Sequence, residues 1–139
     1  MTAHTTLRHR HVLTLSAQPA AVAVARKTAE YVYRTWGVHP RHPALAAALL
    51  MLSELVTNSV RHAAEVSPSL DVLYAVGGGV LAFAVHDRHP HRPDLTTIAK
   101  PGGGLAIIAE LTTEYAGTAT VRPDADAGGK SIWITLPLQ

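Results

Sequence analysis

The polar residues best placed to do chemistry lie in the segment 52–63, which reads LSELVTNSVRHA. At about 100° per residue, one side of a helix would be an apolar stripe, made of Leu45, Leu49, Leu52, Val56, Val60 and Ala63. Glu54 and Asn58 fall one turn apart on the other side, and Leu50 and Met51 flank them. A helix apolar on two sides is buried on both, so we expect Glu54 and Asn58 to face a ligand cavity.

Carboxylate and amide oxygens are hard ligands that suit Mg²⁺, which proteins hold through few side chains together with substrate phosphates. The alternative is an ordinary solvated helix face, on which Glu54 and Arg61 form a loose ion pair.

A glycine run provides a candidate phosphate site. Gly102, Gly103 and Gly104 lead into a predicted helix that starts with Leu105, and backbone N–H groups at such a helix start bind anions. A flexible hinge is the alternative. The run is neither a Walker A motif nor a dinucleotide-binding fingerprint, because the closing residues and the strand–helix–strand context differ.

Two further residues complete the candidate site. Asp87 ends a predicted strand, where its carboxylate can accept a hydrogen bond from the exocyclic amine of adenine; a turn-forming aspartate is the alternative. Lys130 lies in Gly129-Lys130-Ser131, which resembles the end of a P-loop but falls between two predicted strands. We expect Lys130 either near phosphates or as a plain lysine at a strand edge.

The pattern predicts one domain over residues 1–139, with an α+β two-layer sandwich and helices on one face of a mixed, largely antiparallel sheet. Glycines 77–79 predict a hairpin, and residues 87–104 form a long segment typical of a lid or a disordered loop. The expected strands are at 11–15, 70–76, 80–85, 116–122 and 131–136. The expected helices are at 19–36 and 104–111, with a third that carries Glu54 and ends near residue 64.

The composition excludes several classes. The chain has 139 residues, 47% of them hydrophobic, and no cysteine, so disulfides and thiolate zinc sites are excluded. The net charge of +2 is spread out, whereas direct nucleic-acid binding needs a concentrated basic surface. The longest apolar run, 44–52, is too short for a membrane span. We therefore expect a soluble, cytoplasmic protein.

The order Glu54-x-x-x-Asn58, then Asp87, then Gly102-x-Gly104-Leu105 resembles the GHKL ATPase superfamily with its Bergerat nucleotide-binding fold. The segment 53–62 (SELVTNSVRH) is similar to the N box of the single-domain anti-sigma-factor serine/threonine kinases of actinobacterial type. The resemblance covers about residues 10–137.

The resemblance implies ATP and Mg²⁺ as cofactors, with Asn58 as the metal ligand, Glu54 as the general base and Asp87 contacting adenine. Gly102, Gly103, Gly104 and Leu105 would line the phosphates beneath a lid at 88–101. It also implies a sigma factor and a STAS-domain anti-anti-sigma protein as partners, and a homodimer.

One departure bears on function. The family's first glycine box reads Asp-x-Gly-x-Gly, whereas this chain has Asp87-Arg88-His89-Pro90-His91, which stiffens the turn beneath the adenine. Three functions therefore stay open: an anti-sigma serine/threonine kinase, a non-catalytic regulatory module of the same fold with weak or lost ATP binding, and a phosphohistidine-type kinase component acting in trans.

Overall fold

The structure, a computed structural model, describes residues 8–63, 65–89 and 104–139. Its elements in chain order are β1 (His9–Ser16), α1 (Ala20–Thr35), α2 (Pro43–Ala63), β2 (Ser69–Gly77), β3 (Val80–Asp87), α3 (Gly104–Glu114), β4 (Thr118–Pro123) and β5 (Lys130–Pro137). The expected helices and strands are all present, with ends shifted by a few residues.

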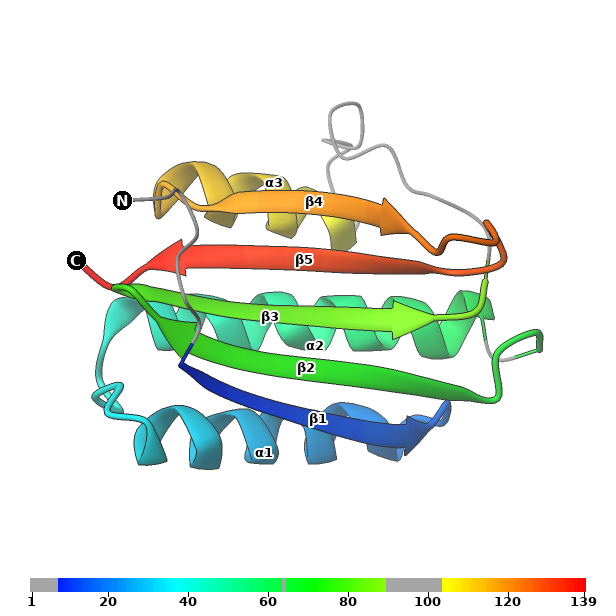
Figure 1. Ribbon diagram of the computed structural model, residues 1–139, viewed down its shortest axis with the longest axis horizontal. Coiled ribbons are helices and arrows are strands. Elements are labelled where there is room, and N and C mark those ends of the chain that lie inside the picture. Colours follow the sequence, from blue (N-terminus) through cyan, green and yellow to red (C-terminus); the bar gives the residue numbers. More distant parts are fainter. Residues whose placement is uncertain (1–7, 64, 90–103) are drawn as a thin grey trace.

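The five strands of these described ranges form one sheet in the order β1-β2-β3-β5-β4, and the three helices described with them lie together on one of its faces (Figure 1). The prediction of a two-layer α+β fold is confirmed. Our expectation of a mixed sheet is wrong, because all four strand pairings are antiparallel. The reason lies in β4 and β5: they form a hairpin of their own, and β5 returns beside β3 in the opposite direction.

The β2–β3 connection is the hairpin that the glycines predict. Gly78 and Gly79 have φ angles of 61° and 76°, values that residues with a side chain rarely adopt. This tight turn sets the register of β2 against β3, in which Tyr74 pairs with Phe83.

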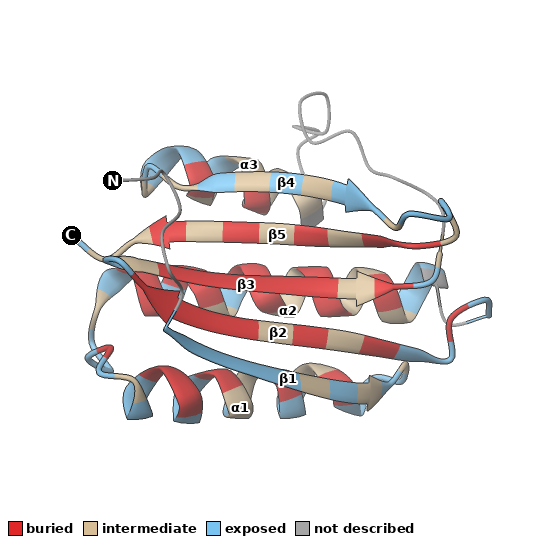
Figure 2. Cartoon of the chain, in the orientation of Figure 1, coloured by how far each residue is buried: buried red, intermediate tan, exposed pale blue. Residues whose placement is uncertain are grey.

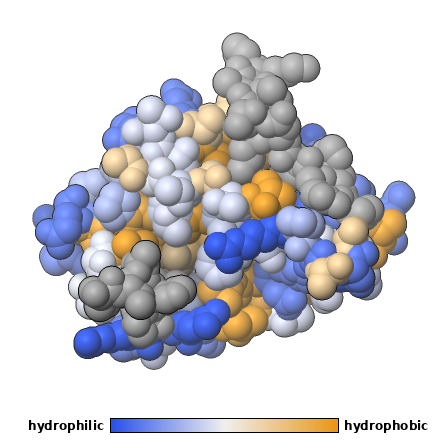
Figure 3. Space-filling model, turned by 45° about the horizontal axis from the view of Figure 1, so that its top comes forward, coloured by the Kyte–Doolittle hydropathy of each residue, from blue (hydrophilic) through white to orange (hydrophobic). Residues whose placement is uncertain are grey.

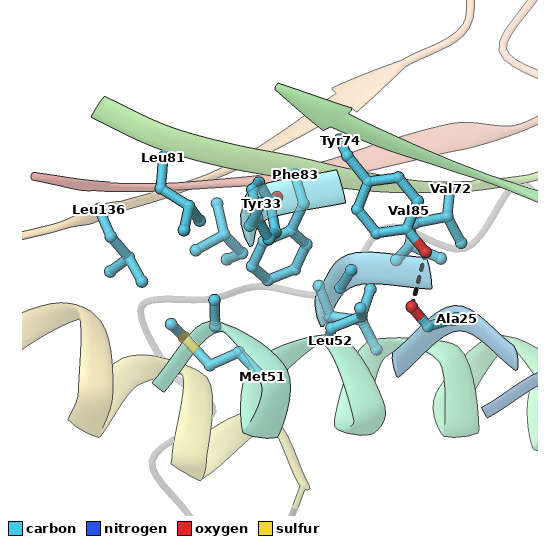
Figure 4. Close-up of a cluster of buried hydrophobic side chains, with 14 of the residues drawn as sticks. Ala25, Tyr33, Met51, Leu52, Val72, Tyr74, Leu81, Phe83, Val85 and Leu136 are labelled. Carbon is cyan, nitrogen blue, oxygen red and sulfur yellow. Dashed lines mark hydrogen bonds between the residues drawn. The ribbon is translucent and has the colours of Figure 1, made fainter. Parts of the chain in front are cut away.

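The core lies between the sheet and α2, which runs across the middle of the sheet between α1 and α3 (Figures 1 and 2). Met51 and Leu52 of α2 point toward Phe83 and Leu136 of the sheet (Figure 4), and all four are at most 1% exposed. Leu50, by contrast, is 42% exposed. Met51 is thus buried on the sheet side of the helix, and the predicted burial on a second side is not observed at Leu50.

The central position of α2 also explains its composition. The stretch Pro43–His62 is long and apolar enough to cross a membrane, the one such helix in the described ranges, yet half of it is buried inside the domain. The buried half of this helix belongs to the core of the sandwich.

Two tyrosines carry hydroxyl groups into this core. The Tyr33 hydroxyl donates to the carbonyl of Ala82 at 2.6 Å, and the Tyr74 hydroxyl donates to the carbonyl of Ala25 at 2.7 Å. Their rings meet edge to face with centroids 5.9 Å apart. Burial raises the pKa of both phenols, and the neighbouring Tyr74 raises the pKa of Tyr33 further.

These buried phenols should make the protein sensitive to alkali. An unfolded tyrosine loses its proton near pH 10, by about the reference pKa, while the folded protein keeps both protons to higher pH. The contribution of these two phenols to the free energy of unfolding should thus be constant below about pH 10 and fall above it, by up to about 1.4 kcal/mol per pH unit for each tyrosine. Urea titrations between about pH 9 and 11 measure this slope.

Tyr33→Phe and Tyr74→Phe should each flatten that alkaline slope. Tyr31→Phe is the matched control, because Tyr31 lies on the same helix and is 63% exposed. An unchanged slope in Tyr33→Phe would contradict the assignment.

Candidate functional site

Asp87 is the centre of the candidate site. It is the last residue of β3, is 3% exposed, and lies opposite Lys130 in the β3–β5 register. The ammonium group of Lys130 donates to Oδ1 at 2.6 Å, and the hydroxyl of Ser59 donates to Oδ2 at 2.6 Å. The backbone N–H of His89 also donates to Oδ1, at 3.0 Å. A charge this deeply buried is tolerated only when it is paired and hydrogen-bonded, and Asp87 has both a cation and two further donors.

Ser59 connects this carboxylate to α2. It directly follows Asn58 in the chain and is 7% exposed, on the buried side of the helix. Sequence reasoning missed it. The sequence did contain a sign of its role, since Ser59 lies near the apolar stripe of the helix. A buried polar side chain needs a hydrogen-bond partner, so an acceptor for this hydroxyl could have been expected. Through this hydrogen bond, the polar motif of α2 and the end of β3 meet in one place.

Lys130 is buried, with its side chain 10% exposed in the ion pair with Asp87. Neither sequence interpretation, a phosphate ligand or a plain lysine at a strand edge, foresaw this partner. A contact between Lys130 and phosphates stays a prediction.

Glu54 and Asn58 are both partly exposed. Within the described residues, neither side chain makes a hydrogen bond or an ion pair, and the alternative pairing of Glu54 with Arg61 is not formed. The neighbouring Ser53 marks the side of α2 that faces α1, because it accepts a hydrogen bond from Arg26 at 3.0 Å. Asn58 lies about 140° round the helix from Ser53.

Since α1 and α3 flank α2 on opposite sides (Figure 1), Asn58 lies on the α3 side. Glu54 is displaced from Ser53 in the same direction, by about 100°. The two side chains of the predicted pair are thus free to meet a ligand on that side.

The glycine run enters α3. Gly104 is the first residue of this helix, and Leu105 is partly buried and packs against the core. Gly102 and Gly103, and the predicted lid from residue 90 onward, lie outside the described residues. The C-terminal end of α2 and the end of β3 lie at the same end of the molecule, while α3 packs alongside α2 (Figure 1).

The chain just after Asp87 is held by the β4–β5 turn. Arg88 pairs with Asp124 and with Asp126, the latter at 2.9 Å, and its hydrogen bond lowers the pKa of Asp126 to about 2. A Cβ on Gly129 would lie 2.6 Å from the carbonyl oxygen of Asp87. Only glycine permits the backbone at position 129 to come this close to Asp87. Gly129 is thus explained by the packing of the turn, without a P-loop.

The described residues contain no group of three or more histidine and acidic side chains that could hold a metal ion by themselves. A cation of the Mg²⁺ type is held mainly by phosphates with one or two protein oxygens, and the amide oxygen of Asn58 is one donor without a partner among the described residues. The face of the domain shown in Figure 3 mixes polar and apolar residues.

Comparison with solved structures shows the same fold in three proteins. A structure of the RsbU and RsbW domains of Rv1364c from Mycobacterium tuberculosis has a TM-score of 0.69 at 23% identity, over 93% of this chain and 32% of that one. The histidine kinase domain of the Erythrobacter litoralis blue-light activated kinase EL346 has a TM-score of 0.56 at 18% identity, over 86% and 60%. The Acinetobacter baumannii histidine kinase AdeS also has a TM-score of 0.56, at 15% identity, over 93% and 68%.

The chain thus spans about a third of the Mycobacterium tuberculosis chain that it matches. No curated protein matches it. The sequence family described as the histidine kinase-like ATPase domain matches residues 15–136, which is nearly the whole chain. The arrangement of α2, β3 and α3 described above agrees with this match. The chain therefore belongs to the histidine kinase-like ATPase domain family.

Proposed function

We propose that this domain is an ATP-binding regulatory protein that works as an anti-sigma-factor serine/threonine kinase on a STAS-domain partner. The observation that carries the proposal is the hydrogen bond from Ser59 to Asp87. It joins the helix that bears Glu54 and Asn58 to the strand end expected to recognise adenine, so residues far apart in sequence converge at one site.

The binding roles follow from the chemistry of each group. Asp87 accepts a hydrogen bond from the adenine amine, and Asn58 contributes an oxygen to Mg²⁺. The N-terminus of α3, which begins at Gly104, favours phosphate through its N–H groups and its helix dipole. The metal, when bound, neutralises charge on the phosphates; the protein residues bind and orient the nucleotide.

Glu54 is the proposed general base. Its carboxylate has no partner among the described residues and is partly exposed, so it can accept a proton from a serine hydroxyl of a protein substrate. Phosphoryl transfer depends mainly on positioning and on charge neutralisation, and one carboxylate beside a nucleotide site meets the need for a base.

The partner assignment rests on two resemblances. The segment 53–62 resembles the N box of anti-sigma-factor kinases, and the fold is similar to that in a structure containing an RsbW domain. A sigma factor as the bound protein, a STAS-domain protein as the phosphate acceptor, and a homodimer all belong to this proposal.

A second candidate is a non-catalytic binding module. Arg88, the first residue after Asp87, is fixed by Asp124 and Asp126, and no glycine stands at positions 89 or 91. A stiff turn here favours weaker nucleotide binding. The two candidates differ in one observable: the kinase transfers phosphate from ATP to a STAS-domain protein, and the non-catalytic module does not.

Two substitutions on α2 separate metal binding from chemistry. Asn58→Ala removes the proposed Mg²⁺ ligand, so it should lower both the Mg²⁺-dependent ATP affinity and any phosphoryl transfer. Glu54→Gln keeps the size of the side chain but not its basicity, so it should leave ATP affinity unchanged and slow transfer by about 10²–10⁴-fold. Calorimetric titration with and without Mg²⁺, and a transfer assay on a STAS protein, measure these effects.

Glu30→Gln is the matched control, since Glu30 is exposed on α1. If Glu54→Gln transferred phosphate at the rate of the parent, Glu54 would not be the base. If both variants at positions 54 and 58 matched the parent in binding and transfer, the kinase proposal would fail.

A second pair of variants separates binding from folding at Asp87. Asp87→Ala should lose the adenine contact, which costs about 1–3 kcal/mol of binding. It also leaves the buried ammonium of Lys130 without a counter-charge, and breaking such a pair costs about 3–5 kcal/mol of stability. Combining Asp87→Ala with Lys130→Met removes both charges, so urea titration should show most of the stability restored while ATP affinity stays low.

ATP affinity equal to the parent's in that stable double variant would rule out a direct contact between Asp87 and the nucleotide. Asp71→Ala, which removes a carboxylate that is 44% exposed on β2, is the control for the general loss of negative charge.

A further inference from the structure

The strand β1 forms an open edge of the sheet. In the part of the chain that the structure describes, its one neighbouring strand is β2, and it pairs with β2 along its whole length without a bulge. An edge strand carries unpaired N–H and C=O groups, so it accepts a further strand unless charges, proline or a bulge protect it. Residues 12–16 of β1 have no charge and no proline. The other edge strand, β4, ends in Arg122 and Pro123.

Exposed apolar side chains gather beside this open edge. Of the five large hydrophobic side chains that are exposed in the described ranges, three lie here, namely Val12, Val24 and Tyr31. Val12 is 58% exposed and points to the face opposite the three helices, because its neighbour Leu13 packs against the core. Single exposed apolar residues are ordinary, but a group of them beside an unpaired strand indicates a protein-binding surface.

The two α1 residues point toward the same edge. Arg26 faces α2, since it donates a hydrogen bond to the hydroxyl of Ser53 at 3.0 Å. Val24 and Tyr31 lie about 160° and 140° round the helix from Arg26. Both therefore point away from α2, and α1 lies at the β1 side of the domain (Figure 1). The two residues also stand at equal distances from the middle of α1.

The middles of β1 and α1 lie at the same level. The helix runs back along the strand, because His9 at the start of β1 stacks on Trp36 at the end of α1, with ring centroids 5.5 Å apart. Measured from the short connection at residues 17–19, half of the strand is about 13 Å long and half of the helix about 12 Å. One two-fold axis, perpendicular to the sheet beside Val12, can therefore pass the middle of both elements.

We propose that this edge is the interface of a symmetric dimer, in which the β1 strands of two copies pair antiparallel and join the two sheets into one. Val12 meets its own copy at the axis, and Val24 of each copy packs against Tyr31 of the other. Each contact thus occurs twice, as a two-fold interface requires. The inference rests on the homodimer of the proposed function, for which it supplies the surface, and requires neither ATP binding nor kinase activity.

Charge and spacing favour a second copy as the occupant of this edge. Antiparallel pairing about Val12 puts Arg10 opposite Thr14 of the other copy, so like charges do not meet. The helix α1 packs over β2 as well as β1, since Tyr74 of β2 donates to the carbonyl of Ala25. With strands about 4.8 Å apart, the two α1 helices then lie about 10 Å apart across the axis, which is a usual spacing of packed helices.

A single charge at either contact should weaken the dimer. Val12→Lys puts two like charges side by side at the axis, and Val24→Lys brings a charge against Tyr31. Each should raise the dissociation constant of the dimer by about tenfold or more, measured by sedimentation velocity over a range of concentrations. Leu50→Lys is the matched control, because Leu50 is 42% exposed, as against 43% for Val24, and lies on α2 away from this edge.

A pair of opposite charges tests the contact between the helices. Val24→Lys combined with Tyr31→Glu places a cation against an anion at both contacts, so the double variant should dimerise more tightly than either single variant. Within one copy the two positions are about 10 Å apart along the helix, so the recovery cannot come from a pair inside one copy.

Cross-linking tests the position of the axis. The chain contains no cysteine, so Val12→Cys introduces a single thiol beside the proposed axis. Oxidation should link two copies through position 12, seen as a dimer on denaturing electrophoresis, whereas Leu50→Cys should stay a monomer there.

Three results would overturn the inference: a parent that stays monomeric, which would leave the edge to a strand of another protein; lysine variants at 12 and 24 that dimerise like the parent; or Val12→Cys that links no better than Leu50→Cys. Titration of the same samples with MgATP keeps the two proposals apart. A monomer that binds ATP defeats the dimer and leaves the nucleotide site standing, and a β1 dimer that binds no ATP does the reverse.

Discussion

The ion pair between Asp87 and Lys130 is the interaction on which the arrangement of the site depends. A carboxylate and an ammonium that are both nearly inaccessible to water lose much of their hydration, and only close pairing with additional hydrogen bonds compensates for that loss. Here the compensation comes from Lys130 on β5, Ser59 on α2 and the backbone at His89. The buried charge therefore fixes one point at which two strands, a helix and the backbone just after β3 must meet.

The central helix α2 serves both the core and the candidate site. Leu52 and Val56 fill the space under the sheet, and Ser59 reaches the strand end. Glu54 and Asn58, on the side toward α3, have no side-chain partner in the described part of the chain. Because the core holds the helix in place, the polar residues are held too, without needing hydrogen bonds of their own. A binding site requires side chains that are rigidly supported. In α2 one side of the helix packs into the core, and this packing holds the polar residues on the other side in place.

Local sequence rules were sufficient for the elements but not for their contacts. The two glycines of the β2–β3 hairpin and the apolar periodicity of α2 act within a few residues, so both features were predictable. The partnership of Asp87 with Lys130 depends on the register of β3 against β5, and 42 residues, 88–129, separate those strands in the chain. No local pattern carries that register, which is also why the fully antiparallel sheet was missed. Ser59 was within reach, because a hydroxyl on a buried helix side requires an acceptor.

The central claim is that the cluster around Asp87, with the polar side of α2 and the start of α3, binds a nucleotide. Amide NMR of the ¹⁵N-labelled protein, titrated with MgATP, tests it most directly. The account predicts saturable shifts concentrated in three places, namely residues 54–59, 87–89 and 104–106, with little change on β1 or on the exposed side of α1. Absence of saturable shifts, or shifts confined to the uncovered face of the sheet, would contradict it.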